Sequence, residues 1–177
     1  IRLLSMDASH RRREVLARVG YMPSEAMFYP SMKVKDVILF AAGIRKKDCG
    51  KEAERICRLL GVDTEKRIRE LSLGNRKKVS IVCAMQHRPQ LLILDEPTSG
   101  LDPLMQEAFF GLLLEYNRQG TTCFLSSHVL SEVKKYCRNA AFIKDGKIIR
   151  RDSVEGAPLD ELFMHYYEED KDDTAEA

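Results

Sequence analysis

The sequence predicts an α/β domain with a mainly parallel sheet flanked by helices. Two short apolar segments, at residues 91–94 and 121–125, have the length of strands and alternate with longer segments that repeat apolar residues at helical spacing. Residues 91–94 are continuously apolar, which is typical of a strand buried on both faces of a parallel sheet, and 121–125 is predicted to be a second buried strand. At 177 residues the chain is long enough for one substantial core. We therefore expect one domain over residues 1–167.

The other elements follow in order along the chain. Before the first of these strands, apolar residues recur at helical spacing over residues 33–60, with a break near 48–50, and a further helix ends before Pro89. These helices predict a helical lobe at about residues 30–88. The remaining predicted elements are a helix at 11–18, a strand at 17–22, helices at 104–117 and 129–138, and strands at 140–143 and 147–150 joined by a turn.

Composition narrows the class of protein. The formal charge of +2 is spread along the chain, so nucleic acid is not an expected partner. The five cysteines show no CxxC spacing and are interpreted as reduced packing thiols, which favours the cytosol. No apolar run approaches the ~20 residues that a membrane-spanning helix needs, so a membrane role would require a partner. The acidic tail at 168–177 is predicted to be disordered.

Two adjacent carboxylates, Asp95 and Glu96, follow directly after the predicted strand at 91–94. Ligands of α/β domains bind at the carboxyl ends of parallel strands, so both side chains are candidates for chemistry. One carboxylate there can hold the water shell of Mg²⁺, and its neighbour can orient or deprotonate a water for in-line attack on a phosphate. Asp95 fits the first role and Glu96 the second. For this segment alone, a strand followed by an acidic turn is the alternative.

Two later polar segments are further candidates. A tight loop with Ser99, Gly100 and Asp102 comes directly after the carboxylate pair, and taken alone it is only a turn. His128 follows the predicted strand at 121–125 and would lie beside the carboxylates if the two strands are neighbours. There it could donate to a γ-phosphate oxygen or hold the attacking water. A surface or helix-capping histidine is the alternative.

The segment before the helix that ends near Pro89 reads Leu71, Ser72, Leu73, Gly74 and Asn75. Ser72 can cap this helix, and Gly74 can bring backbone N–H groups close to an anion. A capped helix start without a ligand is the alternative.

In this order and spacing, these elements resemble the ATP-binding domain of ABC proteins, over the chain as far as about His165. The resemblance implies a P-loop ATPase fold in which the helical lobe carries the signature motif. It identifies residues 71–75 as the signature, Asp95 and Glu96 as part of Walker B, 99–102 as the D-loop and His128 as the switch histidine. Segments 22–25 and 159–163, with the Leu-Ser-Leu-Gly-Asn form of the signature, are most similar to the ATPase subunits of bacterial exporters.

Two departures from the family pattern stand out. Ser24 occupies the place of the Q-loop glutamine, which leaves the adjacent Glu25 as a candidate metal ligand. The phosphate-binding motif GxxxxGK[ST] is absent, because neither Gly-Lys pair, at 50–51 or 146–147, has the required spacing. In the family this motif lies upstream of the point where the chain begins, so we expect an N-terminally truncated domain that starts at Ile1.

By the resemblance, the intact subunit would bind ATP and Mg²⁺, hydrolyse ATP, and pair head to tail with a second ATP-binding subunit. Hydrolysis would drive membrane permease subunits from the cytoplasmic face of the membrane. One rival is a truncated interaction module that offers its signature face to a complete partner without hydrolysing ATP. The other is an ABC ATPase of translation or DNA repair, which the lack of a long coiled coil or basic arm disfavours.

Overall fold

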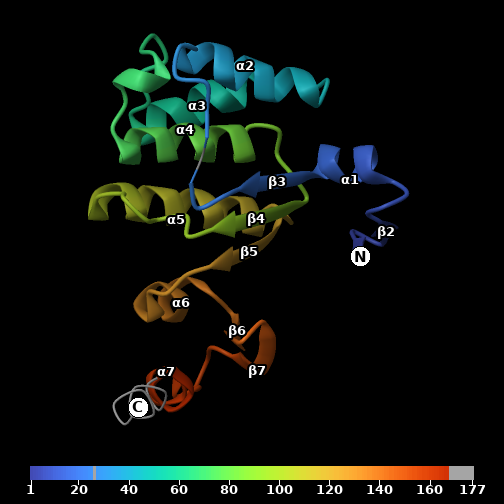
Figure 1. Cartoon of the computed structure of the whole chain (residues 1–177), viewed down its shortest axis with the longest axis vertical. Coiled ribbons are helices and arrows are strands. Elements are labelled where there is room, and N and C mark those ends of the chain that lie inside the picture. The colour runs from blue at the N-terminus through green and yellow to red at the C-terminus, as the bar shows by residue number, and fades with distance from the viewer. Residues whose placement is uncertain (26, 168–177) are drawn as a thin grey trace, which may run out of the picture. The chain divides into compact units, whose positions relative to one another are not determined.

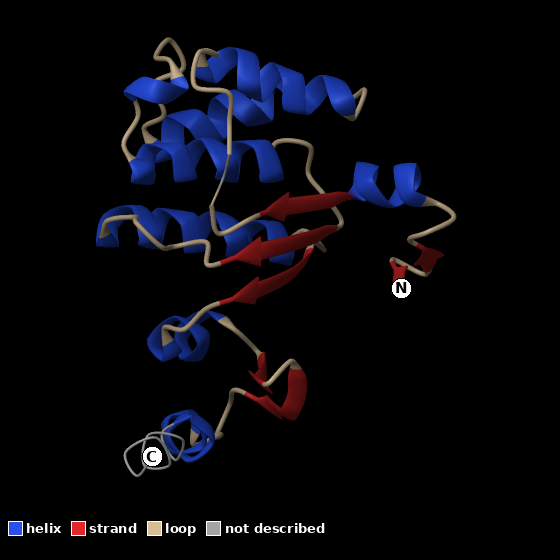
Figure 2. Cartoon of the chain, viewed as in Figure 1, coloured by secondary structure: helices blue, strands red, loops and turns tan. Residues whose placement is uncertain are grey.

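The computed structural model describes residues 1–25 and 27–167, so the tail predicted to be disordered lies outside the described residues. Two compact units are present, Ile1–Ser126 and the residues from Ser127 onward. The elements (Figures 1 and 2) are β1 (Arg2–Leu3), β2 (Met6–Asp7), α1 (Arg12–Arg18), β3 (Val19–Met22), α2 (Val34–Ile44), α3 (Gly50–Leu60), the 3-10 helix η1 (Ile68–Glu70), α4 (Leu73–Met85), β4 (Leu91–Asp95), α5 (Pro103–Arg118), β5 (Thr122–Ser126), α6 (Leu130–Tyr136), β6 (Asn139–Lys144), β7 (Lys147–Ser153) and α7 (Leu159–Tyr167).

A parallel sheet forms the centre of the first unit, with β4 between β3 and β5. Met22 of β3 pairs with Leu94 of β4, and Asp95 of β4 pairs with Ser126 of β5. The carboxyl ends of the three strands therefore lie at one edge of the sheet. This arrangement confirms the predicted α/β class and its parallel sheet.

The strands β4 and β5 are not buried on both faces, so that expectation was wrong for both apolar segments. In β4, Leu92 and Leu94 are buried, while the alternate residues Leu91, Ile93 and Asp95 are only partly buried. In β5 no residue is fully buried, and Phe124 is 60% exposed. An apolar run shows that a strand is apolar, but whether a helix covers each face depends on its neighbours in the sheet.

Helix α4 packs directly against one face of this sheet, and Gly20 in β3 makes the close approach possible. A Cβ atom at Gly20 would lie 2.1 Å from the carbonyl oxygen of Ala84 in α4 and 2.7 Å from a methyl carbon of Leu92. No side chain fits in that space, so the backbones of β3 and α4 come into near contact. The buried side of β4 is the side that faces α4.

The N-terminal segment contacts part of the opposite face without burying it fully. Met6, Val15 and Val19 form a buried cluster, and Leu91 and Ile93 of β4 pack against it. The short antiparallel pair of β1 and β2, which contributes to this face, was not predicted from the sequence. It is too short to show a strand period.

The helices α2, α3 and α4 pack against one another, with α3 and α4 adjacent and α2 on α4. Figure 1 shows them stacked beside β3, and they occupy residues 34–85 of the chain. Their buried side chains include Val34, Ile56, Leu60, Val79 and Ile81. The lobe therefore carries residues 71–75 at the start of α4, next to the sheet.

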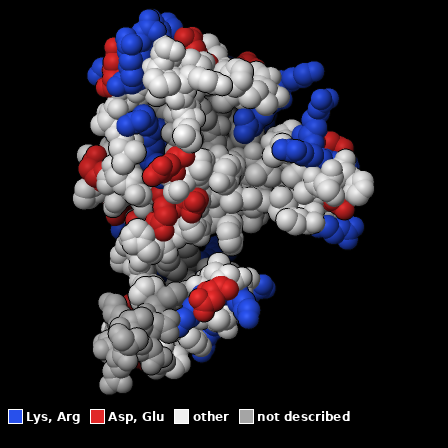
Figure 3. Space-filling model, in the orientation of Figure 1, with Lys and Arg blue, Asp and Glu red and all other residues white. Residues whose placement is uncertain are grey.

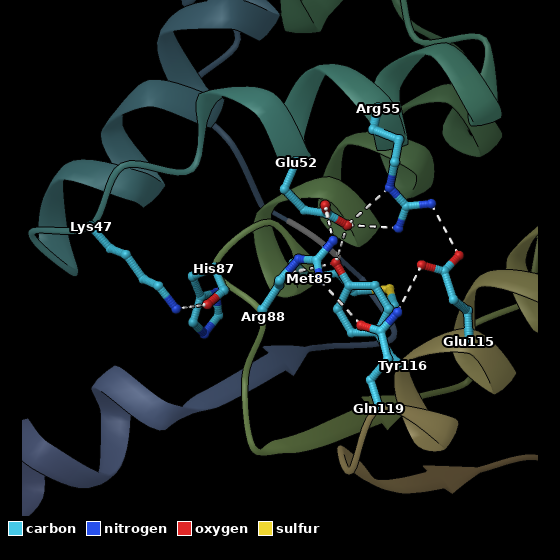
Figure 4. A network of polar contacts seen from close by, with 9 residues as sticks. All are labelled: Lys47, Glu52, Arg55, Met85, His87, Arg88, Glu115, Tyr116 and Gln119. Carbon is cyan, nitrogen blue, oxygen red and sulfur yellow. Dashed lines mark hydrogen bonds and ion pairs between the residues drawn. The ribbon is translucent and has the colours of Figure 1, made fainter.

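A polar network joins this lobe to α5 (Figure 4). The carboxylate of Glu52 in α3, with only 11% of its side chain exposed, accepts hydrogen bonds from Arg55, Arg88 and Tyr116, each at 2.7 Å. Arg55 also pairs with Glu115 of α5 at 3.0 Å. Because the carboxylate is mostly shielded from water and has three donors, the network links α3, the end of α4 and α5.

Stability should depend on pH through Glu52. Burial raises the pKa of Glu52, but the hydrogen bonds from Arg55, Tyr116 and Arg88 outweigh it and lower that pKa from 4.5 to about 2. A depressed carboxylate pKa adds stability that is fully present above pH 4.5 and is lost as the pH falls toward 2. We expect the free energy of unfolding to drop by up to about 3 kcal/mol across this window from Glu52 alone.

Chemical denaturation of the chain at pH 7, 4.5 and 3 measures this effect. Glu52→Gln should be less stable than wild type at pH 7 and should lose less stability on acidification. The control is Glu54→Gln, whose exposed carboxylate faces Arg58 on the surface of the same helix. If the two variants show the same pH dependence as wild type, Glu52 does not contribute as described.

The second unit contains α6, the antiparallel pair of β6 and β7, and α7, as predicted for the strands and their turn. Phe142 of β6 is buried and contacts the ring of Tyr166 in α7, with centroids 6.0 Å apart. Lys134 of α6 forms an ion pair with Asp160 of α7. Among the described residues, none of the helices is both long enough and apolar enough to cross a membrane.

Candidate functional site

The candidate carboxylates lie where the parallel strands end. Asp95 is the last residue of β4 and Glu96 follows it, while Ser24 follows the end of β3. The pairing of Met22 with Leu94 places the segments after these two strands side by side. Acidic side chains gather on this face around the carboxyl ends of β3 and β4 (Figure 3). The edge therefore offers the carboxylate oxygens that the sequence predicted there.

Ser126 holds both members of the carboxylate pair, and sequence reasoning did not single it out. Its hydroxyl donates to Oδ1 of Asp95 at 2.5 Å and accepts from the backbone N–H of Glu96 at 3.1 Å. The signal was a serine at the end of the next strand, but its position opposite Asp95 follows only from the register of β4 and β5. Ser126 fixes the orientation of one carboxylate and the backbone of the other.

The backbone of Glu96 is unusual for a residue with a side chain. Its φ of 45° lies in the left-handed region, directly at the point where the chain leaves β4. The turn continues with hydrogen bonds from the N–H of Ser99 to the carbonyl of Glu96 and from Leu101 to Thr98. A sharp turn of this kind ends the strand and aims Glu96 away from the strand direction.

Residues 71–75 form the start of α4, as predicted. Ser72 is the N-cap of the helix, and its hydroxyl accepts the backbone N–H of Asn75 at 3.3 Å. Leu71 is buried, whereas Leu73 is exposed. The segment is thus anchored by Leu71 and Ser72, and it presents its remaining residues at the N-terminus of a helix of 13 residues.

The structure brings this segment together with the loop after β4. A Cβ atom built on Gly74 would lie 2.5 Å from the carbonyl oxygen of Gly100, and one built on Gly100 would lie 3.7 Å from a methyl carbon of Leu73. Gly100 itself has a φ of 79°, a left-handed conformation that glycine adopts readily. The two predicted segments therefore touch through two glycines, with no room for a side chain at Gly74.

Asp102 and Ser99 have structural roles in the same loop. Asp102 caps α5, because its carboxylate accepts the backbone N–H of Met105 at 3.0 Å and Pro103 occupies the first turn. Ser99 donates its N–H to Glu96 within the turn. The predicted nucleotide-binding role of these residues stays a prediction.

His128 lies at the start of the second unit, two residues beyond Ser126. The residues on either side are fixed by a local turn, in which Ser127 Oγ donates to Glu132 at 2.9 Å and accepts the N–H of Val129 at 3.1 Å. The condition for the predicted role of His128, that β4 and β5 are neighbours, is met. Its place beside the carboxylates stays a prediction.

The oxygen donors at this edge fit magnesium in its usual form. Within the described parts of the chain, no group of three or more His, Cys, Asp and Glu side chains could enclose a metal ion. Mg²⁺ is commonly held by one or two carboxylates together with water and substrate phosphates, and Asp95 at the strand end suits that arrangement. Glu25 lies in the loop after β3 and stays a candidate second ligand.

Comparisons with known proteins agree on one family. A family model described as "ABC transporter" matches residues 1–99, which are 99 of the 177 residues. An ABC transporter ATP-binding protein of Alkalihalophilus pseudofirmus is 38% identical, over 72% of this chain and 50% of the relative. A bacitracin transport ATP-binding protein of Bacillus licheniformis is 35% identical, over 85% of this chain and 49% of the relative. The chain spans about half the length of both relatives.

Solved structures give the same result. The ATP-binding subunit of an ABC transporter superposes with a TM-score of 0.83 at 25% identity, over 91% of this chain and 73% of that chain. A dimeric bacterial ABC transporter cassette shares the fold, with a TM-score of 0.72 at 20% identity. With a family match over more than half of its length, and with the predicted segments gathered at the ends of β4 and α4, the chain belongs to the ABC transporter family as an ATP-binding domain.

Proposed function

We propose that this chain is part of an ABC-type ATPase subunit that hydrolyses ATP with Mg²⁺ to drive a membrane permease. The observation that carries the proposal is the pair of Asp95 and Glu96 at the carboxyl end of β4, both held by Ser126. Such strand ends are the ligand-binding edge of α/β sheets. Relatives named for transport favour this role over one in translation or DNA repair.

The carboxylates divide the chemistry between them. Bound Mg²⁺ would neutralise charge on the β- and γ-phosphates of ATP. Asp95, oriented by Ser126, would hold the water shell of the metal, and Glu96 would orient or deprotonate the attacking water. His128 donates to the γ-phosphate or holds that water. Glu96 follows the end of β4 directly, in a left-handed turn.

The signature face acts on a second ATP-binding subunit. Ser72, Gly74 and Asn75 lie at the N-terminus of α4, where backbone N–H groups and the helix dipole favour an anion. In a head-to-tail dimer this face closes on the ATP held by the P-loop of the partner, and the loop with Gly100 moves with it because the two segments touch. A dimeric cassette with this fold supports the arrangement.

The permease contacts the helical lobe. Exposed apolar side chains are concentrated on α2 and the segment before it, namely Met27, Tyr29, Leu39, Phe40 and Ile44. Clustered apolar side chains of this kind mark contact surfaces for other proteins. The loop that begins at Ser24 leads directly into this surface, so the ATP site and the permease contact are adjacent in the chain. The subunit would then work at the cytoplasmic face of the membrane.

The test is ATP hydrolysis by the full-length gene product that contains residues 1–177, with and without Mg²⁺. Phosphate release that requires Mg²⁺ and ceases with EDTA supports the proposal. The rival, a non-hydrolysing interaction module, predicts no release by this protein alone, with hydrolysis appearing only when a second, complete ATP-binding subunit is added. That result would contradict the proposed activity and leave only the dimer role.

A further inference from the structure

Lys77 is a buried lysine in the helix that carries the signature residues. It lies in α4, close after Asn75, and only 3% of it is exposed. Lysine is rarely buried to this degree unless its charge has partners. Its neighbour Lys78 is only partly buried and makes a natural reference.

The ammonium group of Lys77 donates a hydrogen bond to the backbone carbonyl oxygen of Ser24 at 2.7 Å. Ser24 stands just beyond the end of β3, in the loop that also holds Glu25. The bond therefore ties α4 to the loop after β3, two segments more than 50 residues apart in the chain. A charged donor on a backbone carbonyl is stronger than a neutral hydrogen bond, especially where water is excluded.

The charge of Lys77 interacts with three carboxylates, although burial has the larger effect on its pKa. Burial lowers the pKa of Lys77, and the negative charges of Asp95, Glu96 and Glu25 act in the opposite direction. The register explains this proximity, because the segments after β3 and β4 lie side by side and Lys77 reaches one of them. The cation is thus set among the groups proposed to handle Mg²⁺ and water.

We propose that Lys77 is a positioning residue of the ATP site, which holds the loop after β3 by the Ser24 carbonyl and keeps a positive charge at the carboxyl-end edge of the sheet. The inference rests on the proposed ATPase function. Its charge offsets part of the negative charge that the carboxylates and the transferred phosphoryl group would bring together at this edge. Its hydrogen bond keeps the Ser24 and Glu25 loop at that edge.

The same side chain connects three parts of the molecule. It starts from α4, holds the loop that leads to the exposed surface of α2, and interacts through its charge with the carboxylates at the end of β4. A change at the carboxylate edge that moves Lys77 would therefore move both the signature helix and that loop. This connection could not be predicted from the sequence, because Lys77 lies within a run of basic residues that is typical of a solvent-exposed helix face.

Two substitutions separate the hydrogen bond from the charge. Lys77→Gln keeps a donor for the Ser24 carbonyl but removes the charge, and Lys77→Met removes both. Lys78→Met is the matched control on the same helix. Hydrogen exchange of residues 21–29 reports the hold on the loop, and steady-state hydrolysis by the full-length gene product reports kcat and KM for ATP.

We expect Lys77→Met to speed hydrogen exchange of residues 21–29 about tenfold, and Lys77→Gln to change it less. Both variants should lower kcat about tenfold or more while KM for ATP changes less than about threefold, since the role lies in the transition state. Lys78→Met should match wild type in both measurements.

Failure of the inference and failure of the proposed function give different results. A wild-type protein without Mg²⁺-dependent hydrolysis contradicts the proposed function, whereas the exchange measurement still tests the hold on the loop. Wild-type kcat in Lys77→Met, or equal exchange of residues 21–29 in all variants, overturns the positioning role. If both Lys77 variants lose kcat/KM entirely through a higher KM, Lys77 contributes to nucleotide binding, and this result likewise overturns the positioning role.

Discussion

Glu96→Gln is expected to leave ATP binding intact and to slow hydrolysis at least about 100-fold in the full-length gene product. The amide has the same size as the carboxylate, so the turn at Glu96 and its hydrogen bond from the backbone N–H to Ser126 should persist. What is lost is the group that orients or deprotonates the attacking water. Steady-state phosphate release and nucleotide binding, measured in parallel, give the two halves of the result.

Glu65→Gln is the control, because Glu65 is a surface carboxylate of the helical lobe paired with Lys33 and Lys35. It should hydrolyse ATP at the wild-type rate. A rate for Glu96→Gln within a few-fold of wild type would remove Glu96 from the catalytic role. A variant that no longer binds ATP would show that the substitution disturbed the site rather than the chemical step.

Gly74→Asp is expected to abolish the ATP-driven dimer. Two effects act in the same direction. The Cβ atom would lie 2.5 Å from the carbonyl oxygen of Gly100, so either α4 or the loop after Glu96 must shift. The added carboxylate would also repel the γ-phosphate that the signature face is proposed to meet. Size-exclusion chromatography with ATP in the Glu96→Gln background measures the dimer.

Gly74→Ala separates the two effects, because it adds the Cβ atom without the charge. We expect a weakened dimer for alanine and none for aspartate. Gly111→Ala in α5 is the matched control, since a Cβ atom there meets nothing within 4 Å. An undiminished dimer in Gly74→Asp would show that this face does not meet a nucleotide.

The helices and central strands could be predicted because their segments are long enough to distinguish the periodicity of a helix from that of a strand. Helix α5 and strand β4 fall within one residue of the predicted 104–117 and 91–94 at each end. The burial of β4 and β5 could not be predicted, because it depends on which neighbours cover each face of the sheet. The contact made by β1 and β2 with Leu91 and Ile93 is likewise a tertiary effect.

In the candidate site, too, some features follow from the local sequence and others only from tertiary contacts. Asp95, Glu96 and residues 71–75 could be proposed from the sequence because adjacent carboxylates after an apolar run, and a capping serine before a helix, are local patterns. Ser126 and Lys77 were missed because their roles come from contacts across the sheet edge, 31 and 53 residues away in the chain. A local pattern can identify the groups that react, whereas the groups that hold them are defined by the register.

The left-handed backbone at Glu96 implies a trade-off between the stability of the fold and its catalytic activity at this position. A residue with a Cβ atom gives up about 1 kcal/mol to adopt this conformation, a cost that glycine avoids and asparagine partly avoids. Selection of variants for thermal stability should therefore favour glycine at position 96. The same substitution should abolish ATP hydrolysis, so that a gain in thermal stability and a loss of activity would arise together.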